Sequence, residues 1–231
     1  MEVYINPRIN EDIFLKNPLD SELGKKIIST SVKMIDEVGF SKFNFKKLGL
    51  EIESTEASIY RYFPNKHNIL VYLSSWYWEF LLYQINIKTK TVEDPREKLK
   101  IAISNLVNIP PEGQMHSFLD MYTLQSIINE QFYKIVRTKK ISMQNDSGFF
   151  ESYKRLCSAL ASLFNNIDSS FKYPMTMATS IVEMSINNTY CSSNLPSLTE
   201  IKCGSDQKGQ IENMIQYFCE RLLDKCELSL N

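Results

Sequence analysis

The sequence is poor in glycine and in net charge. It has 7 glycines in 231 residues, too few for glycine-rich phosphate loops or for an all-β fold built on tight turns. A formal net charge of -1 argues against a polybasic nucleic-acid tail and against an acidic disordered segment. DNA binding by a small basic patch stays open, because such binding depends on where the charges lie.

Signatures of metal binding and of common enzymes are missing as well. The five cysteines form no CxxC or CxxH pair, so we expect no zinc site and a reducing compartment. His67 and His116 belong to no Ser-His-acid pattern, and no P-loop or dinucleotide fingerprint is present. We expect no catalytic residues, no metal and no cofactor, although an enzyme with an acid-base site made of carboxylates remains an alternative.

The sequence also lacks targeting and membrane-spanning signals. Its first 14 residues have neither the basic nor the apolar region of a signal peptide. The most apolar stretch, 69–87, carries Glu79 and several amides and serines, and its apolar spacing favours a buried helix. We therefore expect a cytoplasmic protein that does not bind membranes.

Apolar residues recur at helical spacing through most of the chain, and no segment alternates as a strand does. This pattern predicts an all-α fold. Asn-Pro pairs without a period predict an irregular N-terminal arm over residues 1–20. Caps and stop signals predict helices over 22–38, 45–52, 56–62, 66–87, 95–109, 148–167, 174–191 and 207–226, with one or two more within 115–139. The helix over 66–87 is apolar nearly all round, which predicts a central strut.

The first helices are spaced as in a helix-turn-helix, with a three-to-four-residue turn between the second and third. A specific resemblance to a known protein family lies in three stretches: VGF (38–40), Phe45-x-x-Leu48 and SIYRYFPNK (58–66). Residues 25–73 resemble the N-terminal DNA-binding region of the tetracycline-repressor (TetR) family. The resemblance implies a helix-turn-helix domain over 21–66, joined by the long fourth helix to a helical ligand-binding and dimerisation domain within 67–231.

The side chains of this region suit contact with DNA. Ala57 and Ser58 are small enough for the tip of a recognition helix in the major groove, and Arg61 could bind guanine or phosphate. The resemblance implies DNA contacts at Ser58, Tyr60, Tyr62 and Lys66, and a phosphate contact at Asn44. The candidate DNA-binding residues are Asn44, Lys46, Thr55, Glu56, Ala57, Ser58, Tyr60, Arg61, Tyr62 and Lys66.

The distribution of charge agrees with this assignment. Residues 24–70 contain eight basic and five acidic residues, a net charge of +3, whereas residues 1–23 carry -3 and residues 71–231 carry -1. The positive segment is the one with the motif, as phosphate binding requires.

Three residues depart from the family pattern. Glu53 stands in the turn where the family usually has glycine, Ser54 replaces a branched apolar residue, and Glu56 lies at the tip of the recognition helix. A glutamate with a positive φ angle is strained, so we expect the turn to adopt another geometry. These departures keep open an interaction protein, derived from a helix-turn-helix protein, that no longer binds DNA.

The remaining residues supply candidates for a ligand pocket and for a dimer seam. Met and aromatic side chains suit an apolar or aromatic effector, although each could equally belong to an ordinary core. The candidate pocket walls are Trp76, Phe80, Tyr83, Met121, Tyr122 and Tyr153. In the family the last two helices pair across a two-fold axis, and the candidate seam is Ile211, Met214, Ile215, Phe218 and Leu222. The alternative is that this face packs within its own chain.

Together these observations predict a regulator of transcription rather than an enzyme. Its expected partners are a near-palindromic double-stranded DNA operator, a small-molecule effector and a second copy of the chain. Ligand-controlled repression is the expected mode of action.

Overall fold

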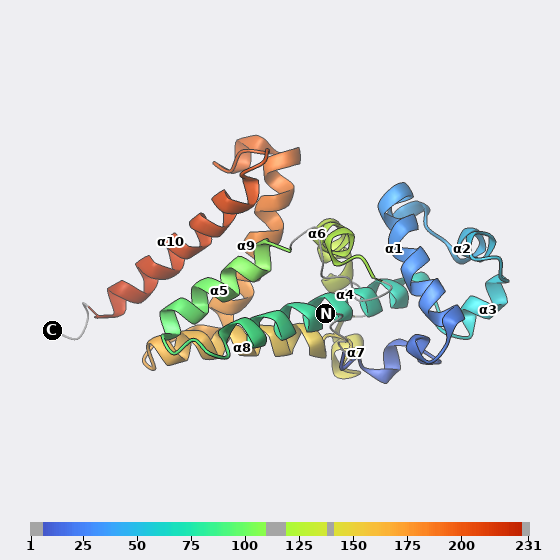
Figure 1. The fold of residues 1–231 in the computed structure, drawn as a ribbon, viewed down its shortest axis with the longest axis horizontal. Coiled ribbons are helices and arrows are strands. Elements are labelled where there is room, and N and C mark those ends of the chain that lie inside the picture. Colours follow the sequence, from blue (N-terminus) through green and yellow to red (C-terminus); the bar gives the residue numbers. More distant parts are fainter. Residues whose placement is uncertain (1–6, 110–118, 138–140, 228–231) are drawn as a thin grey trace. The chain divides into compact units, whose positions relative to one another are not determined.

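The fold comes from a computed structural model that describes residues 7–109, 119–137 and 141–227, with side chains to residue 224 in the last helix. The described residues form ten α-helices and no strand, which confirms the predicted all-α class (Figure 1). His116 and the side chain of Cys226 lie outside the described residues. The helices are α1 Glu22–Lys42, α2 Phe45–Glu51, α3 Glu56–Tyr60, α4 Lys66–Thr89, α5 Pro95–Val107, α6 Met121–Val136, α7 Ile141–Asp146, α8 Glu151–Ile167, α9 Pro174–Asn194 and α10 Gln207–Glu227.

The helix starts follow the capping residues in the sequence. Ser21, Asn44, Thr55 and Asn65 each accept a hydrogen bond from the backbone N–H three residues ahead, at 2.9 to 3.1 Å. Asp94 accepts from the N–H of Arg96 at 3.0 Å, just ahead of the proline that opens α5. Such caps satisfy N–H groups that a helix start would otherwise leave unpaired.

One predicted helix end is displaced. The helix predicted to stop at Val38 has a kink at Gly39, after which one further turn extends α1 to Lys42. Gly39 has φ 75° and ψ 152°, a conformation open to glycine alone and different from the left-handed helical cap that its position suggests. The short helix α7 was not predicted, because its six residues include no buried side chain and hence no periodic apolar signal.

The chain divides into two compact units. Unit 1 contains Met1–Phe80 and Pro110–Tyr153, and unit 2 contains Leu81–Ile109 and Lys154–Asn231. Both the predicted arm and the predicted helix-turn-helix domain lie in unit 1, together with α6 and α7 from the predicted helical domain. Within unit 1, α6 packs against α1; within unit 2, α10 packs against α5 and α9.

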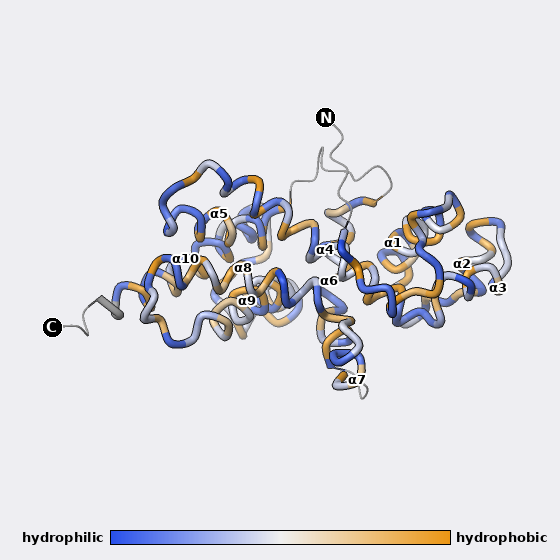
Figure 2. Tube along the Cα trace, turned by 90° about the horizontal axis from the view of Figure 1, so that it is seen from below, coloured by the Kyte–Doolittle hydropathy of each residue, from blue (hydrophilic) through white to orange (hydrophobic). Residues whose placement is uncertain are grey.

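Helix α4 provides much of the core of unit 1. Every residue from Asn68 to Trp78 is buried, so this part of the helix is enclosed on all sides. No helix among the described residues is long and apolar enough to cross a membrane. Figure 2 instead shows hydrophobic and hydrophilic residues mixed along the chain, as along α10.

The N-terminal arm packs into the core of unit 1. Short 3-10 turns at Glu11–Ile13 and Pro18–Asp20 follow the caps Asn10 and Asn17. The side chain of Ile13 is only 1 % exposed, and the ring of Phe14 meets that of Tyr72 edge to face at 5.9 Å between centroids. The arm therefore contributes apolar surface to the core, although its sequence has no regular period.

Candidate nucleic-acid interface

A small hydrophobic core sets the geometry of the helix-turn-helix. Phe45 and Leu48 from α2, Ile52 from the turn and Ile59 from α3 are all buried. The ring of Phe45 meets that of Tyr60 edge to face, with 4.9 Å between centroids. In addition, the ammonium group of Lys26 on α1 donates to the carbonyl of Ile52 at 3.2 Å, at the end of α2. These contacts hold α3 against α2 and tie the turn between them to α1.

The turn places Glu53 in the left-handed region. Its φ is 55°, and among the described residues it is the one non-glycine with a positive φ. The N–H of Ser54 reaches back to the carbonyl of Gly49 at 2.8 Å. A β-carbon on Gly49 would lie 2.9 Å from the carbonyl oxygen of Ser54, so the turn closes tightly over this glycine. The turn thus keeps a left-handed residue despite the glutamate, at a cost of about 1–2 kcal/mol.

Most of the candidate DNA-binding side chains lie on the surface of this motif. The exposed ones are Asn44, Lys46, Thr55, Glu56, Ala57, Tyr60 and Arg61. Ser58 is half-buried, and its hydroxyl lies 2.8 Å from that of Thr55. The first turn of α3 therefore presents small and polar groups outward, as a helix that enters a groove requires.

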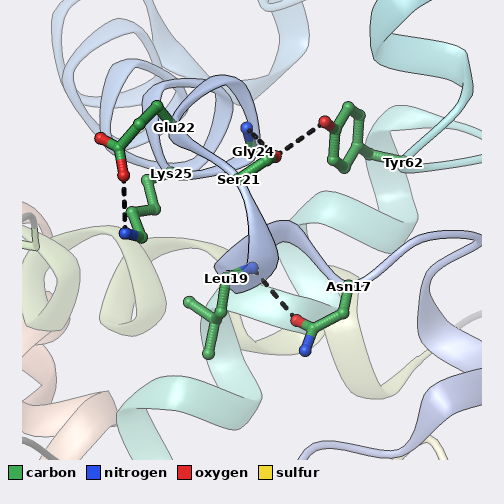
Figure 3. Close-up of polar contacts among 7 residues, drawn as sticks. All are labelled: Asn17, Leu19, Ser21, Glu22, Gly24, Lys25 and Tyr62. Atoms are coloured by element: carbon green, nitrogen blue, oxygen red, sulfur yellow. Dashed lines mark hydrogen bonds and ion pairs between the residues drawn. The ribbon is translucent and has the colours of Figure 1, made fainter.

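Tyr62, by contrast, is enclosed. Its side chain is 4 % exposed, and its hydroxyl lies 2.8 Å from that of Ser21 (Figure 3). Its carbonyl accepts a hydrogen bond from the N–H of Leu15 at 2.8 Å, and the ammonium of Lys16 lies 5.2 Å from the centre of its ring. The N-terminal arm thus holds the residue that follows the recognition helix.

Lys66 also directs its charge into the protein. Its ammonium donates to the carbonyls of Phe40, Ser41 and Phe43 at 2.9, 3.1 and 3.0 Å. It also lies 4.8 Å from the centre of the Phe40 ring. An ammonium has three N–H donors, so these carbonyls use all of them. The start of α4 is thereby tied to the end of α1.

Sequence patterns did not reveal this role of the arm. Its contacts join residues more than 40 positions apart, such as Leu15 and Tyr62, and no local period marks them. The signals that were present, Asn10 and Asn17 as caps, located turns but not the partners of those turns.

The candidate pocket walls fall in different surroundings. Trp76, Phe80 and Met121 are buried in unit 1, whereas Tyr122 is exposed. Tyr153 packs in unit 1 with its ring 5.1 Å from that of Trp78, and Tyr83 is half-buried in unit 2.

A cavity of about 270 Å³ lies in unit 2 and is lined by other residues, from α5, α10 and the end of α8. Its apolar lining includes Leu99, Ile103 and Leu223. Two ion pairs border it: Arg96 with Asp224 at 3.2 Å and Lys100 with Glu220 at 3.4 Å. Cys219 also lines it, and burial raises the pKa of this thiol to about 12, which keeps it protonated at neutral pH.

The residues of the candidate dimer seam on α10 are partly buried and partly exposed. Ile211 and Ile215 are fully buried in the core of unit 2, on the same row as Cys219 and Leu223. Phe218 and Leu222 are 42 % and 44 % exposed, and Tyr217 beside them is exposed as well. Residues four apart form one row on a helix, so the two rows face different surroundings. The exposed row is the part that could meet a second chain.

Comparison with known proteins agrees with this geometry. Residues 27–73, from α1 into α4, match the sequence profile of the bacterial regulatory proteins of the tetR family. This segment therefore carries the helix-turn-helix of the TetR family. No curated protein matches this chain in a sequence search.

Solved structures extend the likeness in fold to most of the chain. A Syntrophomonas wolfei protein assigned to the TetR-family transcriptional regulators has a TM-score of 0.61 at 17 % identity, over 86 % of this chain and 93 % of its own. The fatty acid degradation regulator FadR of Bacillus halodurans has a TM-score of 0.58 at 15 % identity, over 90 % and 95 %. AibR, solved with isovaleryl coenzyme A and operator DNA, has a TM-score of 0.55 at 13 % identity, over 83 % and 96 %. The TetR-type fold therefore extends beyond the helix-turn-helix.

Proposed function

We propose that the protein is a ligand-responsive transcriptional repressor that binds a near-palindromic DNA operator as a homodimer. The observation that carries the proposal is a TetR-type helix-turn-helix whose recognition helix α3 presents Thr55, Glu56 and Ala57 on the surface. The domain also carries the positive segment of an otherwise near-neutral chain. Both features are what docking on a phosphate backbone requires.

The exposed side chains suggest a division of roles on DNA. Lys46 on α2 and the N-cap Asn44 are exposed and would hold phosphates, as would Tyr60 and Arg61 at the end of α3. The first turn of α3 would read base edges, where Glu56 can accept a hydrogen bond from a cytosine amine. In this arrangement the phosphate contacts set the register and α3 supplies the selectivity.

The exposed row of α10 supports a dimer. Tyr217, Phe218 and Leu222 are large apolar or aromatic side chains left on the surface of unit 2. Covering such a row is favourable, and two copies related by a two-fold axis could cover each other's. To read a near-palindrome, the two recognition helices of such a dimer must lie about 34–36 Å apart, one turn of DNA.

The effector site has two candidate locations. One is the set of predicted pocket walls that includes Trp76 and Phe80. The other is the cavity between α5 and α10, whose bordering ion pairs are exposed and contribute at most about 1 kcal/mol each. A small ligand with an apolar body and a charged end could exchange partners with these pairs at little cost. The isovaleryl coenzyme A complex of AibR makes short-chain acyl thioesters a reasonable first class to screen.

DNA selection tests the main proposal. The full-length protein is incubated with a random-sequence duplex pool, bound sequences are recovered, and affinity for the selected duplex is measured at 50 to 200 mM salt. A repressor should select a near-palindrome, and its affinity should fall steeply as salt rises. Failure to select any sequence, or binding that salt leaves unchanged, would favour the interaction protein instead.

Two variants separate the effector sites once a ligand weakens operator binding. Ile103→Trp fills the cavity between α5 and α10, and Phe80→Ala alters the predicted walls. If the cavity holds the effector, Ile103→Trp removes the response and Phe80→Ala retains it. The reverse result assigns the effector to the predicted walls. Saturating ligand that leaves operator affinity unchanged for the wild-type protein contradicts ligand control.

Light scattering tests the dimer. Leu222→Glu places a charge in the exposed row of α10 and should shift the protein toward monomer. Ser158→Glu, an exposed serine on α8, is the matched control and should leave the mass unchanged. A wild-type protein that is monomeric at micromolar concentration contradicts the dimer.

A further inference from the structure

Two residues that the sequence marks as DNA contacts have their polar groups committed inside unit 1. Tyr62 immediately follows the C-terminal cap of α3, and Lys66 is the first residue of α4. The two therefore flank the short segment that leads from the recognition helix into the core of the unit.

Tyr62 is held from three directions by the N-terminal arm and α1. Its hydroxyl meets that of Ser21, its carbonyl accepts from the N–H of Leu15, and Lys16 lies over its ring. Figure 3 shows the Ser21 hydroxyl between the Tyr62 hydroxyl and the N–H of Gly24. The same serine therefore caps α1 and fixes the end of the recognition helix.

The arm that contacts Tyr62 also contacts α4. The side-chain amide of Asn68 donates to the carbonyl of Ile13 at 2.8 Å, in the interior. Nearer the N-terminus, the backbone N–H of Arg8 lies 3.4 Å from a carboxylate oxygen of Glu79. The hydroxyl of Ser152 lies 3.4 Å from the carbonyl oxygen of Arg8. The pose of α3 is thus linked through the arm to α4 and to the start of α8.

Lys66 acts from the other side of the segment. Its three N–H groups meet the three carbonyls at the end of α1, beyond the kink at Gly39. To bind a phosphate, the ammonium would have to leave these carbonyls and strip them of their donor. Leaving the part-buried carbonyls of Phe40 and Phe43 without a donor is unfavourable, so these contacts oppose such a move.

We infer that Tyr62 and Lys66 are positioning residues: they set the pose of the recognition helix and do not themselves contact DNA. The inference rests on the proposed DNA-binding function and deepens it. It assigns phosphate binding to exposed cations such as Lys46 and assigns operator selectivity partly to the arm.

Salt dependence distinguishes a positioning lysine from a phosphate-binding one. Each phosphate neutralised by a protein cation adds about 0.9 to the slope of log affinity against log salt concentration. Removing a phosphate contact therefore lowers the slope and weakens all DNA sequences alike. Removing a positioning residue leaves the slope unchanged. It weakens binding to the selected sequence more than binding to other DNA, because only base reading depends on the precise pose of the recognition helix.

The experiment compares Lys66→Met and Tyr62→Phe with Lys46→Met as the matched control. The probes are the duplex selected by the wild-type protein and a duplex of the same composition in scrambled order, each from 50 to 200 mM salt. Lys46→Met should lower the slope by about 1.8, for two subunits, and weaken both duplexes equally. Lys66→Met and Tyr62→Phe should keep the wild-type slope and reduce the preference for the selected duplex by about tenfold, the discrimination that one good base contact provides.

Circular dichroism and melting curves check that each variant is folded at the assay temperature. If Lys66→Met does not fold, Lys66→Arg takes its place, because a planar guanidinium cannot aim three N–H groups at three converging carbonyls. The arginine variant should also keep the slope and lose preference. A loss of slope at residue 66 equal to that at Lys46, or an equal loss on both duplexes, overturns the inference. A wild-type protein that selects no DNA overturns the proposed function as well, so the two failures differ.

Discussion

The hydroxyl groups of Tyr62 and Ser21 lie 2.8 Å apart and join the end of the recognition helix to the start of α1 (Figure 3). The two residues are 41 positions apart in the sequence. Ser21 simultaneously accepts the N–H of Gly24 at 3.1 Å, so one oxygen serves two elements of unit 1.

Replacing this serine should destabilise the protein measurably. Ser21→Ala removes the cap of α1 and leaves the buried Tyr62 hydroxyl without its partner, for a total loss of about 2 kcal/mol in the free energy of unfolding. Urea denaturation measures the loss. Ser29→Ala, within α1, is the control and should change stability by less than about 0.5 kcal/mol. Equal effects of the two substitutions would contradict the role assigned to Ser21.

The left-handed turn residue predicts a stabilising change. Glu53→Gly relieves the strain of φ 55°, and the gain exceeds the entropy that a glycine costs, for a net stabilisation of about 0.5–1 kcal/mol. Glu51→Gly at the end of α2 is the control and should destabilise the protein by a similar amount. Urea midpoints compare the two, and a loss of stability in Glu53→Gly would show that the turn is not strained.

Close packing of the arm on α1 predicts a cost at Gly24. A β-carbon there would lie 2.2 Å from the carbonyl oxygen of Pro18, a contact that only movement of the arm can relieve. Gly24→Ala should therefore destabilise the protein by about 1–3 kcal/mol despite the helix preference of alanine. Gly209→Ala is the control, since its β-carbon would meet only the side chain of Asp206. Thermal melting of both variants tests the difference.

His67 predicts a pH dependence of stability. Burial lowers its pKa in the folded protein, and a hydrogen bond with Gln144 opposes this only in part. The unfolded chain then binds more protons than the folded one just below the ordinary histidine pKa of about 6.5. As far as His67 is concerned, the free energy of unfolding is greatest above that pH. It falls as the pH drops from there through the lowered folded pKa, by no more than about 1.4 kcal/mol per pH unit.

The variant His67→Gln isolates this contribution. Its free energy of unfolding should change less than that of the wild-type protein between pH 7.5 and 5.5, where carboxylates contribute little to either slope. Urea denaturation at four or five pH values gives both curves. Parallel curves would show that His67 has the same pKa in the folded and unfolded states.

Local signals predicted most helix starts, because a cap is a contact between residues two or three positions apart. Ser21, Asn44, Thr55 and Asn65 cap their helices in the structure as their positions in the sequence indicate. The enclosed part of α4 was also evident, since an apolar surface all round a helix must be covered. The extension of α1 past Gly39 was missed because a glycine normally ends a helix.

Tertiary contacts decided what individual surface residues do. Helical periodicity placed Ile211, Met214, Ile215, Phe218 and Leu222 on one broad face, but only the packing of α10 on α5 and α9 separated the buried row from the exposed one. The sequence predicts DNA contacts for Tyr60 and Tyr62 alike, and both remain predictions. The structure exposes 47 % of the first and buries the second beneath the arm.

Short-range periodicity, caps and a local motif are enough to predict the all-α class and a helix-turn-helix of the TetR type. Tertiary structure alone decided that Glu53 keeps the left-handed turn, that Lys66 binds the end of α1 and that the arm holds Tyr62. Each of these depends on which backbone groups come within hydrogen-bond or van der Waals distance after folding. A carbonyl left without a partner at the end of α1 has no signature among residue types, and only the folded chain brings Lys66 to it.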